Sequence, residues 1–99
     1  MLPHAEAQVA EIYHYSSDRW GEAQADRYYH GLFDTFDAIA SRTALWRPIP
    51  VEFGVAGHFC RYKSHLIYWK LLEDGTVGIV TVLHERMAHA DFLSVAFND

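Results

Sequence analysis

The stretch SHLIYWKLLEDGTVGIVTVLHERM, residues 64–87, decides the fold. Its first part, "LIYWKLL", is almost wholly apolar, as expected of a central strand that is covered on both faces. Asp74-Gly75 follows, which is a strong two-residue signal for a β-hairpin, and "VGIVTVL" then returns as a strand. The stretch therefore predicts an antiparallel hairpin that ends in the polar cluster "VLHERM".

The segments on either side add one strand and a terminal helix. "HFCRYK" alternates roughly between its two sides and predicts a third strand before the hairpin. Pro48 and Pro50 exclude regular helix from the connection that precedes it, residues 41–57. The tail "AHADFLSVAFND" predicts a short amphipathic helix with Phe92, Leu93 and Phe97 on one side.

The first half of the chain predicts two helices. Pro3 suits a first helical turn, and the pattern that it opens breaks at "SSDRWGE", where Gly21 fits a tight turn. The second helix has the most regular apolar spacing of the chain, in steps of 4, 3, 4 and 3 residues, carried by Ala25, Tyr29, Leu32, Phe36 and Ile39. We therefore expect a single α+β domain, residues 1–99, in which a helical hairpin lies across a small antiparallel sheet.

Composition narrows the classes of function. The chain has 8 Lys and Arg against 13 Asp and Glu, a net charge of -5, which argues against the basic face that nucleic-acid binding needs. Cys60 is a lone cysteine, the sequence begins without a signal peptide, and no window of 18 unbroken apolar residues occurs. We expect a soluble cytoplasmic protein.

The titratable residues give no strong catalytic or metal motif. His84-Glu85 followed by His89 differs from the zinc motif H-E-x-x-H because its histidines are five residues apart. A buried apolar thiol explains Cys60 better than a nucleophile does, and the turn explains Glu73 and Asp74. We therefore expect no catalytic residue, no metal and no cofactor.

The basic residues of the strands allow two interpretations. Together with three histidines they are expected to form one polar rim of the sheet: Arg61, Lys63, Lys70 and Arg86, with His58, His65 and His84. Such a rim is either a solvated edge that discourages strand aggregation or a contact surface for a protein or RNA. The residues alone leave both open.

Several stretches, taken in order, resemble the ParE branch of the RelE/ParE toxin superfamily. "AEAQVAEIYHYSSDRWGEAQADRYYHGLFDTFDAIA" is similar to that branch's first two helices, "GHFCRYKSHLIYWKL" to its second and third strands, and "IVTVLHERM" to its last strand. Three features depart from the pattern. Only two residues precede Pro3, so the N-terminal strand of the family is short or missing; His58 stands where Arg is frequent, and Ala88 where Asp is frequent.

The resemblance implies the toxin of a type II toxin–antitoxin pair that stabilises plasmids and is neutralised by a ParD-like antitoxin. The ParE branch is known for poisoning DNA gyrase, whereas the RelE branch cleaves mRNA on the ribosome. The acidic balance favours a non-catalytic poison, with an mRNA endonuclease or an inactive homologue that serves only as an antitoxin partner as alternatives. Candidate contact residues for target or antitoxin are His58, Arg61, Lys63, His65, His84, Arg86 and Met87. Apolar candidates for antitoxin binding are Trp20, Tyr28, Phe33 and Trp46.

Overall fold

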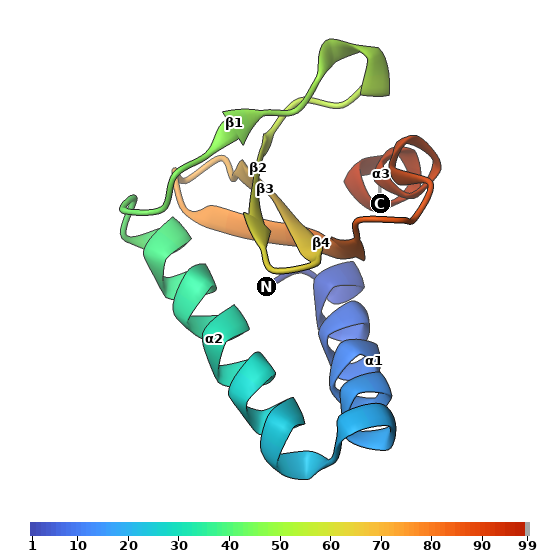
Figure 1. Cartoon of the computed structure of the whole chain (residues 1–99). Coiled ribbons are helices and arrows are strands. Elements are labelled where there is room, and N and C mark those ends of the chain that lie inside the picture. The colour runs from blue at the N-terminus through green and yellow to red at the C-terminus, as the bar shows by residue number, and fades with distance from the viewer. Residues whose placement is uncertain (99) are drawn as a thin grey trace.

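In the computed structural model, which describes residues 1–98, helices and a four-stranded antiparallel sheet confirm the predicted α+β fold (Figure 1). The strands lie in the order β1-β2-β3-β4, so β3 is central, as its apolar sequence predicts. The elements in chain order are α1 (Pro3–Trp20), α2 (Glu22–Ala40), β1 (Arg47–Pro48), the 3-10 helix η1 (Val51–Phe53), β2 (His58–Tyr62), β3 (His65–Leu71), β4 (Val77–His84) and α3 (His89–Asn98).

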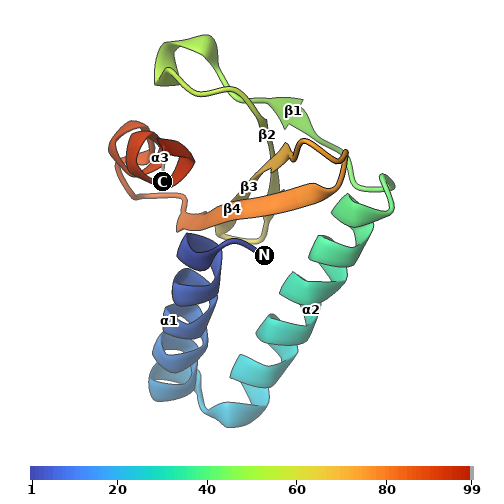
Figure 2. The same ribbon diagram turned by 180° about the vertical axis from the view of Figure 1, so that it is seen from behind.

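The sheet is covered on both faces. The α1–α2 hairpin lies on one face and α3 on the other, as both views show (Figures 1 and 2), and the η1 segment packs on the same side as α3. None of the helices in residues 1–98 is both long enough and apolar enough to cross a membrane.

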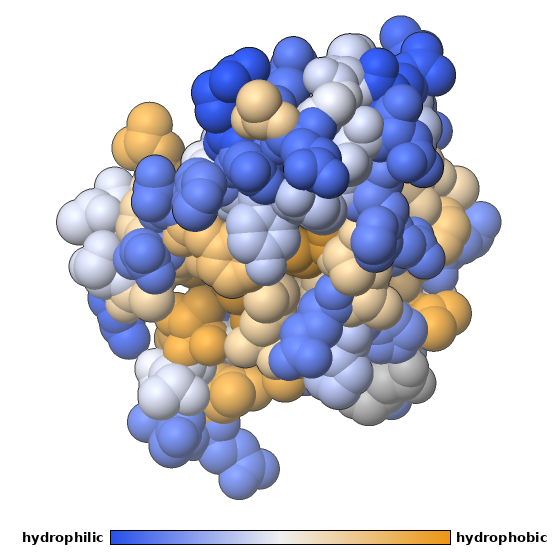
Figure 3. Space-filling model, turned by 90° about the horizontal axis from the view of Figure 1, so that it is seen from below, coloured by the Kyte–Doolittle hydropathy of each residue, from blue (hydrophilic) through white to orange (hydrophobic). Residues whose placement is uncertain are grey.

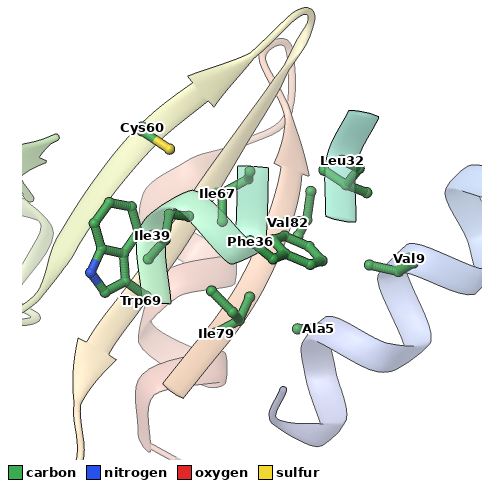
Figure 4. Packing of buried hydrophobic residues seen from close by; sticks show 10 residues of the cluster. All are labelled: Ala5, Val9, Leu32, Phe36, Ile39, Cys60, Ile67, Trp69, Ile79 and Val82. Atoms are coloured by element: carbon green, nitrogen blue, oxygen red, sulfur yellow. The ribbon is translucent and has the colours of Figure 1, made fainter. Parts of the chain in front are cut away.

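The larger core fills the space between the helical hairpin and the sheet (Figure 4). Ile67 and Trp69 of β3 point into it, while Tyr68 between them points to the opposite face and packs with Leu83 and Leu93. This alternation explains the continuous apolar run of β3, because both of its faces are buried. The residues of the larger core are Ala5, Val9, Leu32, Phe36, Ile39, Cys60, Ile67, Trp69, Ile79 and Val82.

The connection between the two long helices is a single glycine. The helix α1 continues to Trp20 and α2 starts at Glu22, so the prediction that "SSDRWGE" breaks the helical pattern was wrong for every residue except Gly21. Gly21 has φ 88° and ψ 163°, a backbone conformation that residues with a Cβ rarely adopt. Its N–H donates to the carbonyl of Ser17 and closes the helix, which lets α2 start at the next residue.

The sheet has one more strand than expected, and its N-terminal strand is reduced to one contact. The two residues of β1 pair with Phe59 and His58, and we missed them because Pro48 and the short length hide a strand. Before α1 the chain is extended only at Leu2, whose N–H donates to the carbonyl of Ile79 at 2.9 Å. The expectation of a short or missing N-terminal strand is therefore confirmed.

A β-bulge shifts the register of β4. Tyr68 pairs with Thr81, but the next residue, Trp69, pairs with Ile79, so Val80 is an extra residue. Because of this extra residue, Ile79 and Val82 both face the helical hairpin although they are an odd number of positions apart.

The tail forms the predicted helix, with a different buried side. Leu93 and Ala96 of α3 are buried and Phe97 packs against the smaller core, whereas Phe92 is 42% exposed. The prediction that Phe92 shares the buried side was wrong because residues at i and i+1 are about 100° apart on a helix, and Leu93 takes the centre of the face.

Candidate functional site

A groove of about 680 Å³ runs between α1 and one end of the sheet. The groove is walled by the later turns of α1 and by Tyr28 of α2 on one side, and by the β2–β3 turn and the end of β4 on the other. Seen from the side of the helical hairpin, apolar residues gather in the middle of the molecule and polar residues surround them (Figure 3). The sequence-predicted residues that line the groove are Trp20, Tyr28, His65, His84, Arg86 and Met87.

Antiparallel pairing brings two histidines face to face in this groove. His65 begins β3 and His84 ends β4, and the register pairs them directly. Their rings are perpendicular, with centroids 5.3 Å apart. Since His65 and Ile67 lie on the same side of β3, both imidazoles face the helical hairpin.

His65 is hydrogen-bonded to a tyrosine of α2 and is neutral at pH 7. The hydroxyl of Tyr28 lies 2.5 Å from Nδ1 of His65. Burial, with a further contribution from the neighbouring His84, lowers the pKa of His65 to about 4, so its imidazole is neutral at pH 7. Burial also raises the pKa of Tyr28, so the phenol keeps its proton at pH 7, and the tautomer of the neutral imidazole decides which of the two groups donates.

A hydrogen bond from the backbone holds the ring of His84, which pairs with His65. The N–H of Arg86 donates to Nδ1 of His84 at 3.2 Å, and the carbonyl of His84 accepts from Nε2 of His89 at 2.9 Å. His89 in turn lies 2.7 Å from the hydroxyl of Tyr68, whose pKa burial raises to about 12. The start of α3 is thereby tied to the same sheet end that carries the groove.

Charged side chains form the rim of the groove beyond the histidines. Arg61 and Glu85 make an ion pair at 2.5 Å, and the hydrogen bond from Arg61 is the main reason why the pKa of Glu85 is lowered. Lys63 lies over the rings of Tyr28 and Tyr62, with its ammonium about 6 Å from each centroid. Arg86 lines the groove and is exposed.

Two exposed aromatic residues close the groove at the C-terminal end of α1. Trp20 is 52% exposed and Tyr15 56% exposed, and their rings meet edge to face at 6.0 Å. The guanidinium of Arg19 lies 5.5 Å above the ring of Tyr15. Sequence reasoning missed Tyr15 and Arg19 because it ended the helix early, although their i, i+4 spacing on a longer helix would have placed them together.

The prediction that these basic residues and histidines form one polar rim was wrong, because His58 lies at the other end of the sheet and Lys70 on its other face. His58 lies at the far end of β2, where it pairs with Trp69 and contacts Trp46. The ammonium of Lys70 lies over the ring of Phe97 on the opposite face of the sheet. These placements follow from antiparallel pairing, which puts the starts of neighbouring strands at opposite ends of the sheet.

Two apolar candidates also lie outside the groove. Phe33 packs against the larger core and contacts the rings of Tyr29 and Phe36, so it supports the hairpin from within. Trp46, which is 55% exposed, belongs to the sheet end that carries His58. As contact sites, all of these residues remain predictions.

Several polar side chains of the groove are already hydrogen-bonded or ion-paired within the chain, so they are less available to transfer protons or to bind a metal ion. Tyr28 is bonded to His65, Nδ1 of His84 accepts from the backbone, and Arg61 is paired with Glu85. In residues 1–98, His, Cys, Asp and Glu nowhere gather in a group of three that could hold a metal ion. The arrangement offers a half-apolar surface with a rim of charged side chains of both signs, suited to binding a segment of another chain.

Comparison with known proteins identifies the family. Residues 1–89 match the family model of the ParE toxin of type II toxin–antitoxin systems, parDE. The chain belongs to the ParE toxin family. It is 32% identical over 87 residues to Toxin ParE1 of Mycobacterium tuberculosis, covering 88% of each chain. It is 30% identical over 83 residues to Toxin ParE1 of Caulobacter vibrioides, covering 84% of this chain and 83% of that one.

Family membership accounts for the main features of the molecule. A ParE toxin is one half of a toxin–antitoxin pair, so an antitoxin is its partner. The residues that carry the resemblance form the helical hairpin and strands β2 to β4, which together build the groove. Nearly all of α3 lies beyond the matched residues 1–89.

Proposed function

We propose that this toxin arrests growth by binding a target protein without catalysis, that the target is DNA gyrase, and that a ParD-like antitoxin neutralises it. The observation that supports a mechanism without catalysis is that Tyr28, His65, His84 and Glu85 are already hydrogen-bonded or ion-paired within the chain. General acid–base catalysis needs a group that is free to exchange a proton with substrate near neutral pH. His65 is neutral, half-buried and bonded to Tyr28, so it is poorly suited to that role.

The choice of gyrase rests on membership of the ParE family and on charge. Cleavage of mRNA requires cations that bind the backbone and stabilise the phosphoryl transition state. Within residues 1–98, the cations at or beside the groove that have no acidic partner are Arg19, Lys63 and Arg86, because Arg61 is paired with Glu85. An overall charge of -5 further supports a protein target over RNA.

The antitoxin is proposed to occupy the groove with an amphipathic segment. Trp20 and Tyr28 supply exposed and half-buried aromatic surface near Ile12 and Tyr15 of α1. This is the kind of surface that an apolar anchor of a partner fills. The same pair of proteins is proposed to act in the cytoplasm and to stabilise a plasmid, since loss of the plasmid ends antitoxin supply.

Induced expression in bacteria tests the growth effect and its target. The chain produced without antitoxin should arrest growth, and purified chain should stimulate DNA cleavage by purified gyrase. Arg86→Ala should weaken both effects, whereas Arg27→Ala, which removes an exposed cation from α2, should leave both unchanged.

Two other results would replace this proposal. New ribosome-dependent mRNA ends that disappear with Arg86→Ala would identify an endonuclease. Growth equal to that of the empty vector, with soluble chain present in the cells, would identify an inactive homologue that serves only as an antitoxin partner.

A binding titration with the antitoxin encoded by the neighbouring reading frame tests the groove. Trp20→Ala should weaken binding roughly tenfold or more, as for an aromatic residue central to an interface. The matched control is Val95→Ala, which removes exposed apolar surface from α3 (Val95 is 55% exposed). Equal affinities for the two variants would exclude the groove as the main antitoxin site.

A further inference from the structure

A second, smaller cavity lies at the end of the sheet opposite the groove. Its volume is about 200 Å³, and it is bounded by the end of α2, the segment that precedes β1, and the ends of β2 and β3. The side chains that matter below are Ile39, Arg42, Trp46, His58, Trp69 and Leu71, which we call the tryptophan pocket. Neither family membership nor the groove explains it.

The walls of the tryptophan pocket are aromatic. The imidazole of His58 lies parallel to the indole of Trp69 with centroids 5.8 Å apart, and Trp46 meets it edge-on at 4.5 Å. Trp69 is 5% exposed and forms a fixed floor, whereas Trp46 is 55% exposed and forms one side of the mouth. An apolar cavity of about 150 Å³ is enough to bind benzene, so this volume accommodates one aromatic ring.

One polar atom of this pocket lacks a partner. Nδ1 of His58 is buried and makes no hydrogen bond, the only side-chain atom in residues 1–98 in that state. A buried polar atom without a partner costs on the order of 1–3 kcal/mol, and native proteins contain few of them. Trp46 packs edge-on against the His58 ring and is itself half-exposed, so the histidine that carries this nitrogen lies next to a side chain at the mouth of the pocket.

The mouth of the tryptophan pocket is cationic. Arg42 lines it, and its guanidinium makes one long hydrogen bond, 3.5 Å, to the carbonyl of Gly75. Arg47, next to Trp46, is exposed, and neither arginine is ion-paired with any residue among 1–98. In the adjacent hairpin, the carboxylate of Asp74 is engaged by the hydroxyl and N–H of Thr76.

We propose that the tryptophan pocket binds a tyrosine side chain of a partner protein, next to a carboxylate of the same partner. The ring inserts between Trp46 and the stacked pair of His58 and Trp69 as Trp46 moves outward, and the carboxylate meets Arg42. A phenol hydroxyl both donates and accepts, so it satisfies Nδ1 of His58 in either tautomer, which neither phenylalanine nor an aliphatic residue does. Because the pocket and the groove lie at opposite ends of the sheet, both can be occupied at once.

Nuclear magnetic resonance with short peptides tests each part of this proposal. The chain contains three tryptophans, and their indole N–H signals report separately on the pocket (Trp46 and Trp69) and on the groove (Trp20). Titration with acetyl-Glu-Tyr-amide should shift the Trp46 and Trp69 signals and leave the Trp20 signal in place. Acetyl-Glu-Phe-amide should bind roughly fivefold more weakly, as for one lost neutral hydrogen bond. Acetyl-Gln-Tyr-amide should bind a few-fold more weakly at low salt.

Two variants connect the result to named residues. His58→Phe keeps the stacked ring and removes the nitrogen, so it should bind the tyrosine and phenylalanine peptides equally. Trp46→Ala removes one wall and should abolish the shift of Trp69. Far-UV circular dichroism and the melting temperature of each variant establish that the sheet is intact.

Three outcomes would overturn the proposal. They are equal affinity of the wild-type chain for the tyrosine and phenylalanine peptides, a Trp20 shift as large as that of Trp46, and stronger shifts of Trp46 and Trp69 with adenosine monophosphate than with any peptide. The last would assign the pocket to a nucleotide.

Discussion

Acidification should destabilise the chain through His65, and the structure gives the sign and size of the effect. The folded-state pKa is about 4 and the ordinary value is 6.5, so the folded chain binds fewer protons than the unfolded chain between these values. The stability contributed by the neutral imidazole is therefore complete above pH 6.5 and is lost as the pH falls toward 4. A fully shielded site would lose about 2 kcal/mol between pH 7.5 and pH 5, and partial exposure reduces this to about 1 kcal/mol.

Urea denaturation of the wild type and of His65→Gln at pH 7.5 and pH 5 measures this effect. Glutamine can still accept a hydrogen bond from Tyr28 but does not titrate, so the variant should lose about 1 kcal/mol less than the wild type between the two pH values. His30→Gln is the matched control, because His30 is an exposed histidine on the helix that carries Tyr28. Its pH dependence should equal that of the wild type. Parallel losses in the wild type and His65→Gln would refute the reasoning.

Three further substitutions test how the fold positions the groove. Gly31→Ala places a Cβ against the hydroxyl of Tyr62, so it should destabilise by about 1 kcal/mol despite a better helix propensity, and it should become stabilising in the Tyr62→Ala background; urea unfolding midpoints of the four proteins test both statements. Gly21→Ala meets no atom within 4 Å but forces alanine to φ 88°, which should cost about 1–3 kcal/mol of unfolding free energy, and an unchanged midpoint would contradict the strain argument. Cys60 should resist alkylation at pH 8 in the folded chain and react in urea, because burial raises its thiol pKa to about 11; rapid labelling under native conditions would disprove this.

The sequence predicted the elements whose signals are local and strong. The regular steps of α2 and the Asp74-Gly75 turn both appear as expected, because a buried face and a tight turn leave few alternatives. The strand β1 was not predicted, because a strand of two residues, one of them proline, has no alternating pattern in the sequence. Phe92 was misplaced because a ten-residue helix has several apolar residues and only one contact face.

The candidate site was predictable only in part, because the direction of each strand decides which strand ends meet. His65 and His84 begin and end neighbouring strands of one hairpin, so their meeting follows from the Asp74-Gly75 turn. His58 also begins a strand, but β2 and β3 run in opposite directions, so it lies opposite Trp69, four residue pairs away from His65. The contribution of α1 to the groove depends on tertiary packing, which the spacing of residues along the chain does not contain.

The bulge at Val80 takes up one residue of length in β4 without moving the histidine pair. Ile79 lies opposite Trp69, and Thr81 and His84 lie opposite Tyr68 and His65, so Val80 alone has no partner residue on β3. Deletion of Val80 would leave a regular strand with the same pairs, and His84 would still share a face with Ile79 and Val82. The length of β4 can therefore differ by one codon at this position between relatives without exchanging the two faces of the sheet. A change in the character of the groove requires substitution of the residues that line it.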